Sequence, residues 1–312
     1  MRIGVIGAGG VGGYFGARCA AAGHDVSFLA RGANLAALRE RGISIRSPLG
    51  DLAMPVDATD EPEKIGPCDV VLLTVKGYAL ASVLPAAREM LGPEGWVAVL
   101  LNGGPGPSEQ VAEVIGAGRT VAGAAYISCH LREPGVLEHH SPLAGMALGE
   151  MSAGGGERLA EFARATRPAG IDVEIAPDVR VLLWTKFAFI CGLAGATAST
   201  GYPIGDVRAT ASGREMLRGL VTEAAAVARG EGVALPADYE ATTLQLLDDI
   251  DGGMRSSLHE DLAHGRPSEL ESLHGEILRR AARLGLAVPV TATVHAVLAP
   301  RAAAAVARAG RS

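Results

Sequence analysis

One lysine occurs inside the most apolar stretch of the chain. The segment LLWTKFAFICGLAGATA covers residues 182–198, and Lys186 is its only charged residue. Taking a charge out of water costs several kcal/mol unless the charge is paired. We therefore expect Lys186 to be paired, to lie at the rim of a cleft, or to belong to a bilayer-spanning segment. At a cleft, its ammonium group could donate a proton to a reacting oxygen.

A glycine-rich segment near the N-terminus indicates a second function, the binding of a phosphate group. GAGGVG, residues 7–12, places Gly7, Gly9 and Gly12 in the G-x-G-x-x-G pattern, with Gly10 between them. It follows a strand-like run and opens a helical one, which is the context of a dinucleotide-binding turn. Such glycines permit a tight turn, a close approach of pyrophosphate and close packing of the helix on the strand. The segment predicts a phosphate site at a helix N-terminus.

The strand-like run after this helix ends in Ala30-Arg31, without a carboxylate. NAD enzymes usually carry Asp or Glu here to hold the ribose 2′-hydroxyl, whereas a guanidinium suits a 2′-phosphate. Arg31 therefore favours NADPH as the cofactor. The alternative is an exposed loop arginine that binds no ligand.

Polar residues also follow two further strand-like runs. Lys76 comes after LLTV, and Asn102 comes after VAVLL. Ligands of open α/β sheets bind beyond the carboxyl ends of the strands, so both side chains could face a nicotinamide or a substrate. The alternative for each is an ordinary turn residue.

A polar cluster at residues 256–271 predicts, from its own pattern, only local structure. Gly265 and Pro267 end one helix, and Ser268 with Glu271 spells a capping box that begins the next. Glu269 then occupies the first helical position, where the helix dipole favours a carboxylate without any further role.

The elements that must position these residues divide the chain in two. Up to residue 177, apolar strand-like runs alternate with helical stretches, which predicts a Rossmann-type parallel sheet covered on both faces. We expect 135–140 and 144–150 to form an added hairpin and 171–175 to form the last strand. Residues 178–312 are predicted to be all-helical. The predicted domains are therefore 1–177, which binds the dinucleotide, and 178–312, with substrate bound between them.

Composition narrows the class of partner. A formal net charge of -6 without a Lys/Arg block argues against nucleic acid. A membrane span at 182–198 would put Lys186 at hydrocarbon depth, so we expect no membrane association.

The four cysteines form no CxxC pair and suit a reducing cytoplasm. The histidines, including His139 and His140, lack ligand-like companions and are predicted to lie on the surface, and no metal site is expected.

Several segments together resemble the ketopantoate reductase family over essentially the whole chain. They are GAGGVG, VK at 75–76, NG at 102–103, WTKFAF at 184–189 and SSLHEDLAHGRPSELESLHGEI at 256–277. The resemblance implies a Rossmann domain followed by a helical domain, and NADPH-dependent reduction of 2-dehydropantoate to pantoate in pantothenate biosynthesis. It also implies a monomer or homodimer that acts on a small 2-oxo acid, and we expect a cytoplasmic location from the cysteines.

The resemblance also assigns roles to single residues. It implies that Lys186 is the general acid, that Glu269 and Ser257 bind substrate, that Asn102 orients the carbonyl or carboxylate, and that Lys76 lies near cofactor and substrate. Glu269 thereby becomes a candidate site residue.

Three positions depart from the family pattern. Family members carry amides where this chain has Ile190, Ala194 and Met254. A site that loses hydrogen-bond partners discriminates poorly for a substrate hydroxyl, and a wider apolar wall prefers a hydrocarbon side chain. The alternatives are therefore a reductase of a more apolar 2-oxo acid or imine, a 3-hydroxy acid dehydrogenase, and a non-catalytic protein that senses NADPH.

Overall fold

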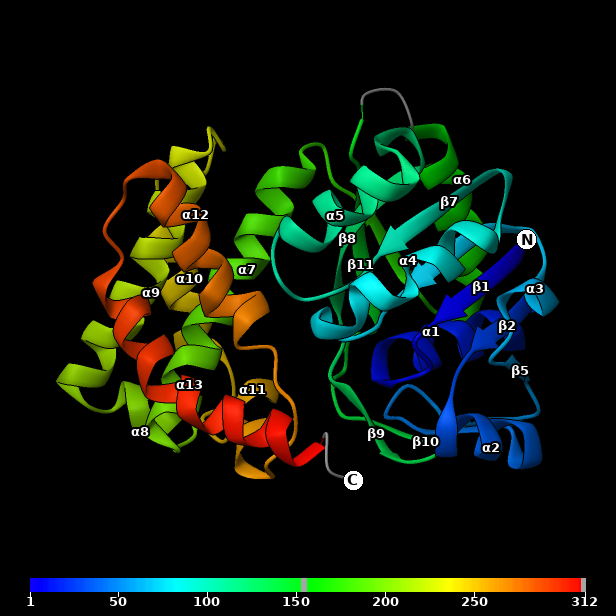
Figure 1. The fold of residues 1–312 in the computed structure, drawn as a ribbon, viewed down its shortest axis with the longest axis horizontal. Helices are drawn as coiled ribbons and strands as arrows, with labels where there is room; N and C mark the ends of the chain where they lie inside the picture. The colour runs from blue at the N-terminus through cyan, green and yellow to red at the C-terminus, as the bar shows by residue number, and fades with distance from the viewer. Residues whose placement is uncertain (153–155, 310–312) are drawn as a thin grey trace. The chain divides into compact units, whose positions relative to one another are not determined.

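The structure is a computed structural model that describes residues 1–152 and 156–309 of the chain. The chain folds into two compact units (Figure 1). Unit 1 comprises Met1–Leu101 and Pro107–Leu182, and unit 2 comprises Asn102–Gly106 and the chain from Leu183 onward. The division falls inside a helix, after Leu182, whereas the boundary between residues 177 and 178 stays a prediction.

An eight-stranded sheet forms the centre of unit 1, in the order β12-β11-β8-β7-β6-β1-β2-β5. The strands are β1 (Arg2–Ile6), β2 (Asp25–Leu29), β5 (Asp57–Thr59), β6 (Cys68–Leu73), β7 (Leu91–Val99), β8 (Thr120–Tyr126), β11 (Gly145–Glu150) and β12 (Asp172–Ile175). All neighbours pair in parallel except β8 and β11, which pair antiparallel. The sheet is therefore mixed, with a parallel core.

Apolar side chains cover both faces of this sheet, as the near-continuous apolar runs predict. Successive strand residues point to opposite faces. Val70 and Leu72 of β6 belong to one core cluster, with Phe15 and Phe162, while Val71 and Leu73 belong to the other, with Leu84 and Val111. The helices that contribute to these two cores include α1 (Gly10–Ala21) and α6 (Gly156–Thr166) on one face, and α4 (Leu80–Glu89) and α5 (Gly106–Ile115) on the other.

The predicted hairpin is wrong in its pairing. Residues 136–139 and 145–150 are both strands, but they belong to different sheets. The first is β10 (Val136–His139), in a second sheet of order β4-β3-β10-β9, whose other strands are β3 (Ile43–Arg46), β4 (Leu52–Met54) and β9 (Cys129–Glu133). The two strands do not pair with each other: β10 pairs with β3 and, in antiparallel orientation, with β9, whereas β11 pairs with β8 and β12.

Unit 2 is helical in the part of the chain that the structure describes. Its helices are α7 (Val179–Thr200, which begins in unit 1), α8 (Ile204–Arg208), α9 (Ala211–Gly230), α10 (Tyr239–Asp249), α11 (Ser257–Ala263), a π-helical turn η4 (Glu271–Gly275), α12 (Glu276–Leu284) and α13 (Pro289–Ala309). The remaining short helices of unit 1 are α2 (Gly32–Arg41), α3 (Pro62–Ile65) and the 3-10 turns η1 (Gly77–Ala79), η2 (Ala117–Arg119) and η3 (Arg167–Ala169).

The apolar helix α7 is a core helix of unit 2. Gly192 lies against Leu247 of α10 and Val221 of α9, and Gly195 lies against His274 of η4. Within residues 1–152 and 156–309, two helices, α7 and α13, are long and apolar enough to cross a membrane by length and composition alone; 67% of the α7 window is buried, against 22% for α13. Burial accounts for the apolar composition of α7 without a bilayer.

Candidate active site

The glycine loop lies where the order of the main sheet reverses direction. β1 is flanked by β2 on one side and β6 on the other, and the loop follows β1 directly. Thr74, just after β6, donates its hydroxyl to the carbonyl oxygens of Gly7 (2.8 Å) and Ile6 (3.0 Å). A Cβ on Gly12 would overlap that hydroxyl and the Gly7 carbonyl. Ligands of open α/β sheets bind at such a switch point.

The start of α1 has room for an anion. Gly9 is the N-cap of α1, its backbone is extended, and no described atom lies within 4 Å of the position a Cβ would take. The first turn of α1 contains no acidic residue. Its backbone amides and the helix dipole therefore favour a phosphate next to Gly9. Gly10 is packed differently, because a Cβ there would overlap the Cys129 carbonyl. This arrangement fits the pyrophosphate of a dinucleotide.

Two predicted cofactor residues lie at the carboxyl ends of strands in the same sheet. Arg31 follows β2, is exposed, and is the N-cap of α2. Lys76 follows β6 and is half-buried at the start of η1. Both belong to the same edge of the sheet as the glycine loop.

Asn34 braces the glycine loop, although nothing in its local sequence indicated this role. Its amide nitrogen donates to the Ala8 carbonyl (2.9 Å), and its amide oxygen accepts from the backbone N–H of Gly135 (2.9 Å). The local sequence around Asn34 in α2 carries no signal of such contacts, because both partners lie far away in sequence.

Lys186 and Glu269 lie together in unit 2. Lys186 is half-buried in α7, and Glu269 is buried, with 5% of its surface exposed. Burial lowers the pKa of Lys186 to about 8, while the negative charge of Glu269 acts to raise it. The charge of the lysine in the apolar segment is thus compensated by a carboxylate. An ammonium with this pKa remains mostly protonated at neutral pH and can still donate its proton.

The predicted capping box at Ser268 and Glu271 does not form. The helical backbone begins with the π-turn η4 at Glu271, and Glu269 precedes it. The hydroxyl oxygen of Ser268 is buried and has no hydrogen-bond partner among the described residues. The Glu271 side chain instead contacts His295 (2.8 Å) and Arg279 (3.4 Å). Glu269 is thus a buried carboxylate whose charge acts on Lys186.

The segment after Asn102 is packed into unit 2. Asn102 is half-buried, and Gly103, Gly104 and Pro105 are buried. A Cβ on Gly104 would lie 2.7 Å from the ring of Phe187, the residue next to Lys186. Asn102 and Lys186 therefore belong to the same unit, although 84 positions separate them in the sequence.

The other predicted substrate residues differ in exposure. On α7, Ile190 is half-buried and Ala194 is 1% exposed, whereas Met254 is 37% exposed. Ser257 is exposed in the first turn of α11, and its neighbour Ser256 caps that helix. The Ser256 hydroxyl also lies 2.9 Å from the Thr197 hydroxyl of α7, which ties this end of α11 to the lysine helix. A substrate role for Ile190, Ala194, Met254 and Ser257 stays a prediction.

The expectation that the histidines lie on the surface is wrong for His139 and for His274, which is 0% exposed, and the expectation that they lack ligand-like companions is wrong for His140. His139 is 3% exposed, and its ring contacts Ser47, Ser141 and the Leu143 carbonyl. His140 has ligand-like companions, because one ring nitrogen each from His140 and His130 and a carboxylate oxygen of Glu138 lie within 4.8 Å of one another.

We assign no metal to this group. The His130 and His140 rings are stacked, with 4.9 Å between centroids and 21° between planes, so their lone pairs do not converge. Arg132 and Arg46 already pair with one oxygen of Glu138.

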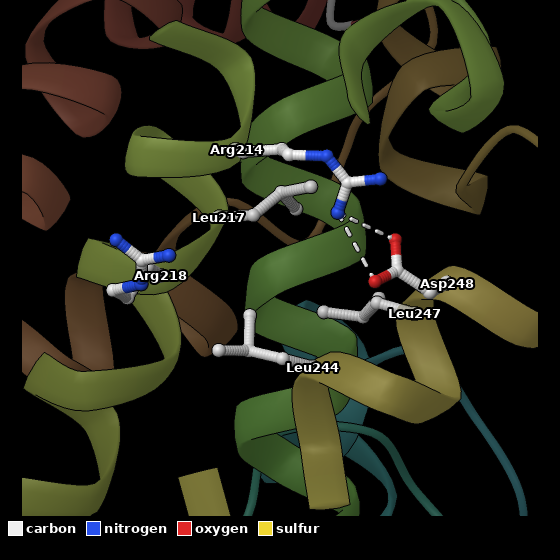
Figure 2. Close-up of a pocket in the computed structure, with 6 residues that line it drawn as sticks. All are labelled: Arg214, Leu217, Arg218, Leu244, Leu247 and Asp248. Atoms are coloured by element: carbon white, nitrogen blue, oxygen red, sulfur yellow. Dashed lines mark hydrogen bonds and ion pairs between the residues drawn. The ribbon is translucent and has the colours of Figure 1, made fainter. Parts of the chain in front are cut away.

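A small pocket in unit 2 does not contain the predicted residues. It measures about 120 Å³ and is lined by Arg214, Leu217, Arg218, Leu244, Leu247 and Asp248 (Figure 2). Two of its three charged side chains pair within the pocket, because Arg214 binds both carboxylate oxygens of Asp248 at 3.0 and 3.1 Å.

A nucleotide-binding α/β unit and a helical unit with a compensated lysine define an oxidoreductase of the dinucleotide-dependent class. Family models agree: the ketopantoate reductase model matches residues 3–153, and the model of the C-terminal part of the same family matches residues 178–302. The chain belongs to the ketopantoate reductase family, oxidoreductases that act on 2-oxo acids and for which NADPH is the typical cofactor.

Individual relatives match over nearly the full length. An uncharacterized oxidoreductase of Bacillus subtilis, YkpB, is 31% identical over 96% of this chain and 98% of its own. A 2-dehydropantoate 2-reductase of Mesorhizobium japonicum is 29% identical over 96% of both chains. The crystal structure of a 2-dehydropantoate 2-reductase from Geobacter metallireducens superposes with a TM-score of 0.89, at 30% identity, over 96% of this chain and 99% of that one.

Proposed function

We propose that this protein reduces a 2-oxo acid to a 2-hydroxy acid with NADPH, and that Lys186 protonates the substrate oxygen. The observation that carries the proposal is the pairing of a half-buried lysine, with its pKa lowered to about 8, and a buried Glu269 that supports its charge. A protein that only senses NADPH has no need of such an ammonium.

The cofactor residues would hold NADPH in unit 1. The open N-terminus of α1 next to Gly9 would take the pyrophosphate, and Arg31 would take the 2′-phosphate. Lys76 would lie near the nicotinamide end. The bound cofactor supplies the hydride.

The protein's own chemistry is then proton donation and orientation. Hydride addition to a ketone carbon leaves negative charge on the oxygen, and the Lys186 ammonium donates a proton as that charge develops. A general acid of this kind contributes about 10²- to 10⁴-fold in rate. Glu269 keeps Lys186 charged and, with Ser257, contacts the substrate, while Asn102 orients its carbonyl or carboxylate.

The substrate side chain is proposed to be more apolar than that of 2-dehydropantoate. Ile190, Ala194 and Met254 offer no side-chain hydrogen bond to a substrate hydroxyl, so they discriminate poorly in its favour. The relatives named 2-dehydropantoate 2-reductase make that substrate the second candidate. We place the protein in the cytoplasm, with no membrane or nucleic-acid partner, as a monomer or homodimer.

One experiment separates the candidates. NADPH oxidation is measured with 2-dehydropantoate, with branched and aromatic 2-oxo acids, and with the matching imines, for the parent chain and for Lys186→Ala. We expect the highest kcat/KM on an apolar 2-oxo acid and a loss of at least about 100-fold in kcat for the variant. A turnover number within a few-fold of the parent would remove Lys186 from the mechanism, and tight NADPH binding without any oxidation would favour the sensor.

A further inference from the structure

The segment Asn102–Gly106 contacts the rest of unit 2 at two points. Gly104 makes the first contact: its φ is +65°, and its backbone lies so close to Phe187 that a Cβ would come 2.7 Å from the ring. A positive φ disfavours every residue with a side chain, and the ring leaves no space for one. This segment therefore requires glycine for both conformation and packing, which explains a glycine at this point of the NGGPGP segment.

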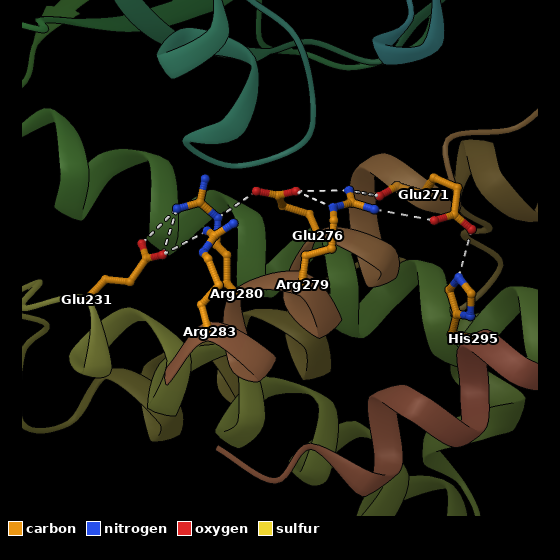
Figure 3. Close-up of polar contacts among 7 residues, drawn as sticks. All are labelled: Glu231, Glu271, Glu276, Arg279, Arg280, Arg283 and His295. Carbon is orange, nitrogen blue, oxygen red and sulfur yellow. Dashed lines mark hydrogen bonds and ion pairs between the residues drawn. The ribbon is translucent and has the colours of Figure 1, made fainter. Parts of the chain in front are cut away.

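Gly106 makes the second contact, against a buried ion pair. A Cβ there would lie 3.1 Å from Oε1 of Glu276 and 3.7 Å from Nη2 of Arg280. The Arg280 side chain is only 3% exposed. Its Nε donates to Glu276 (2.7 Å), and its Nη1 donates to both carboxylate oxygens of Glu231 (2.8 Å each). Figure 3 shows Arg280 between these two carboxylates.

The same arginine also contacts the lysine helix. Its guanidinium lies 5.8 Å from the centre of the Trp184 ring, and Trp184 packs edge-on against Phe187 with 5.6 Å between ring centroids. Trp184 and Phe187 flank Lys186 in the sequence of α7. One continuous set of contacts therefore runs from the Asn102 loop, through Phe187 and Arg280, to the helix that carries the lysine.

We infer that this seat, formed by Gly104, Phe187, Trp184, Glu276 and Arg280, is a positioning device that fixes Asn102 relative to Lys186. The inference rests on the proposed function, because it assumes that Asn102 orients the substrate. A buried arginine between two carboxylates is rigid, since displacing it would leave charges unpaired in the protein interior. Catalysis depends on such rigidity, because a misplacement of about 1 Å can cost on the order of 100-fold in rate.

A double-mutant cycle between Gly104→Ala and Asn102→Ala tests this inference on kcat/KM. If the seat acts through Asn102, Gly104→Ala lowers kcat/KM of the parent by roughly 100-fold but lowers that of Asn102→Ala by no more than about 3-fold. Equal losses in both backgrounds, or parent kinetics for Gly104→Ala, would overturn the inference. Phe187→Leu, which trims the ring instead, enters the same cycle should Gly104→Ala not fold.

Gly285→Ala is the matched control. Gly285 lies in the same unit at φ +67°, and a Cβ there would meet no described atom within 4 Å. It carries the same backbone penalty without touching the seat, so its kcat/KM is expected to equal that of the parent.

Amide hydrogen exchange tests the rigidity of the Asn102 segment without a measurement of catalysis. The amides of residues 102–104 and 106 are expected to exchange at least about 10-fold faster in Arg280→Lys than in the parent, because lysine cannot bind both carboxylates in the arginine's geometry. Unchanged exchange would refute the seat itself. A parent chain that reduces no 2-oxo acid would instead refute the proposed function, and the two failures are therefore distinguishable.

Discussion

The carboxylate of Glu269 opposes the desolvation of Lys186. Burial lowers the pKa of Lys186 from 10.5 to about 8, and the charge of Glu269 acts in the other direction. Because the proton donor must be charged, the proposed reduction is fully active below this pKa and is lost as the pH rises through about 8. We therefore expect the pair to set the alkaline limit of the proposed reaction.

Glu269→Gln is expected to move this limit to lower pH. Without the carboxylate charge, only burial acts on Lys186, so its pKa falls below the parent value and the midpoint of the pH profile moves down by about one pH unit or more. The measurement is kcat/KM against pH, from about 5 to about 10. Glu271→Gln removes an exposed carboxylate two positions away and should leave the profile in place; a Glu269→Gln profile that coincides with the parent would show that the carboxylate does not control Lys186.

Two glycines of the same loop are expected to respond differently to alanine. At Gly12 a Cβ would overlap the Thr74 hydroxyl and the Gly7 carbonyl, so Gly12→Ala should lower the free energy of unfolding by about 1–3 kcal/mol. At Gly9 the space is open, so Gly9→Ala should fold normally and lose NADPH affinity. Urea denaturation and NADPH fluorescence titration measure the two quantities. Parent-like NADPH binding by Gly9→Ala would argue against pyrophosphate at this helix end.

His274 is expected to destabilise the folded chain in acid. It is fully buried, its Nε2 donates to the Cys191 carbonyl oxygen (3.1 Å), and burial lowers its pKa from 6.5 to about 4. Between these two pKa values the unfolded chain binds a proton that the folded chain rejects, and the free energy of unfolding falls by about 3 kcal/mol as the pH drops through that window. In His274→Gln the fall should be smaller by this amount, as measured by urea denaturation near neutral pH and at about pH 4. If the free energy of unfolding fell equally with pH in the parent and in His274→Gln, His274 would not be the group that causes the fall.

Arg31 is expected to select between the two nicotinamide cofactors. It is exposed just beyond β2, where a guanidinium can reach a ribose 2′-phosphate. Arg31→Ala should raise the KM for NADPH about 10-fold or more and leave that for NADH nearly unchanged, since a charge-assisted hydrogen bond contributes about 1.5–3 kcal/mol. Arg39→Ala, in the helix that begins after Arg31, serves as the control. An equal change in KM for NADPH and NADH would mean that Arg31 does not bind the 2′-phosphate.

The nucleotide-binding half could be predicted from local pattern. The strands β1, β2 and β6 and the turn at Gly7–Gly12 are short-range features, because apolar runs and glycine spacing are written directly in neighbouring residues. The pairing of β10 with β3 and of β11 with β8 could not be predicted in this way, since each joins segments that are not adjacent in sequence. The predicted hairpin failed because β10 pairs antiparallel with β9, the strand that precedes it, while β11 pairs with β8 and β12.

The sequence by itself determined that the chain holds a dinucleotide-binding turn, a helical second half and one lysine in an apolar helix. Tertiary structure alone decided what compensates that lysine. Local pattern made Glu269 a first-turn helix residue, whereas the fold buries it before the π-turn and brings its charge to bear on Lys186. Tertiary structure also decided the packing of Gly104, which lies against the ring of Phe187, 83 residues further along the chain. Helix and strand propensities act between neighbours, but desolvation and charge pairing depend on which distant residues the fold brings together.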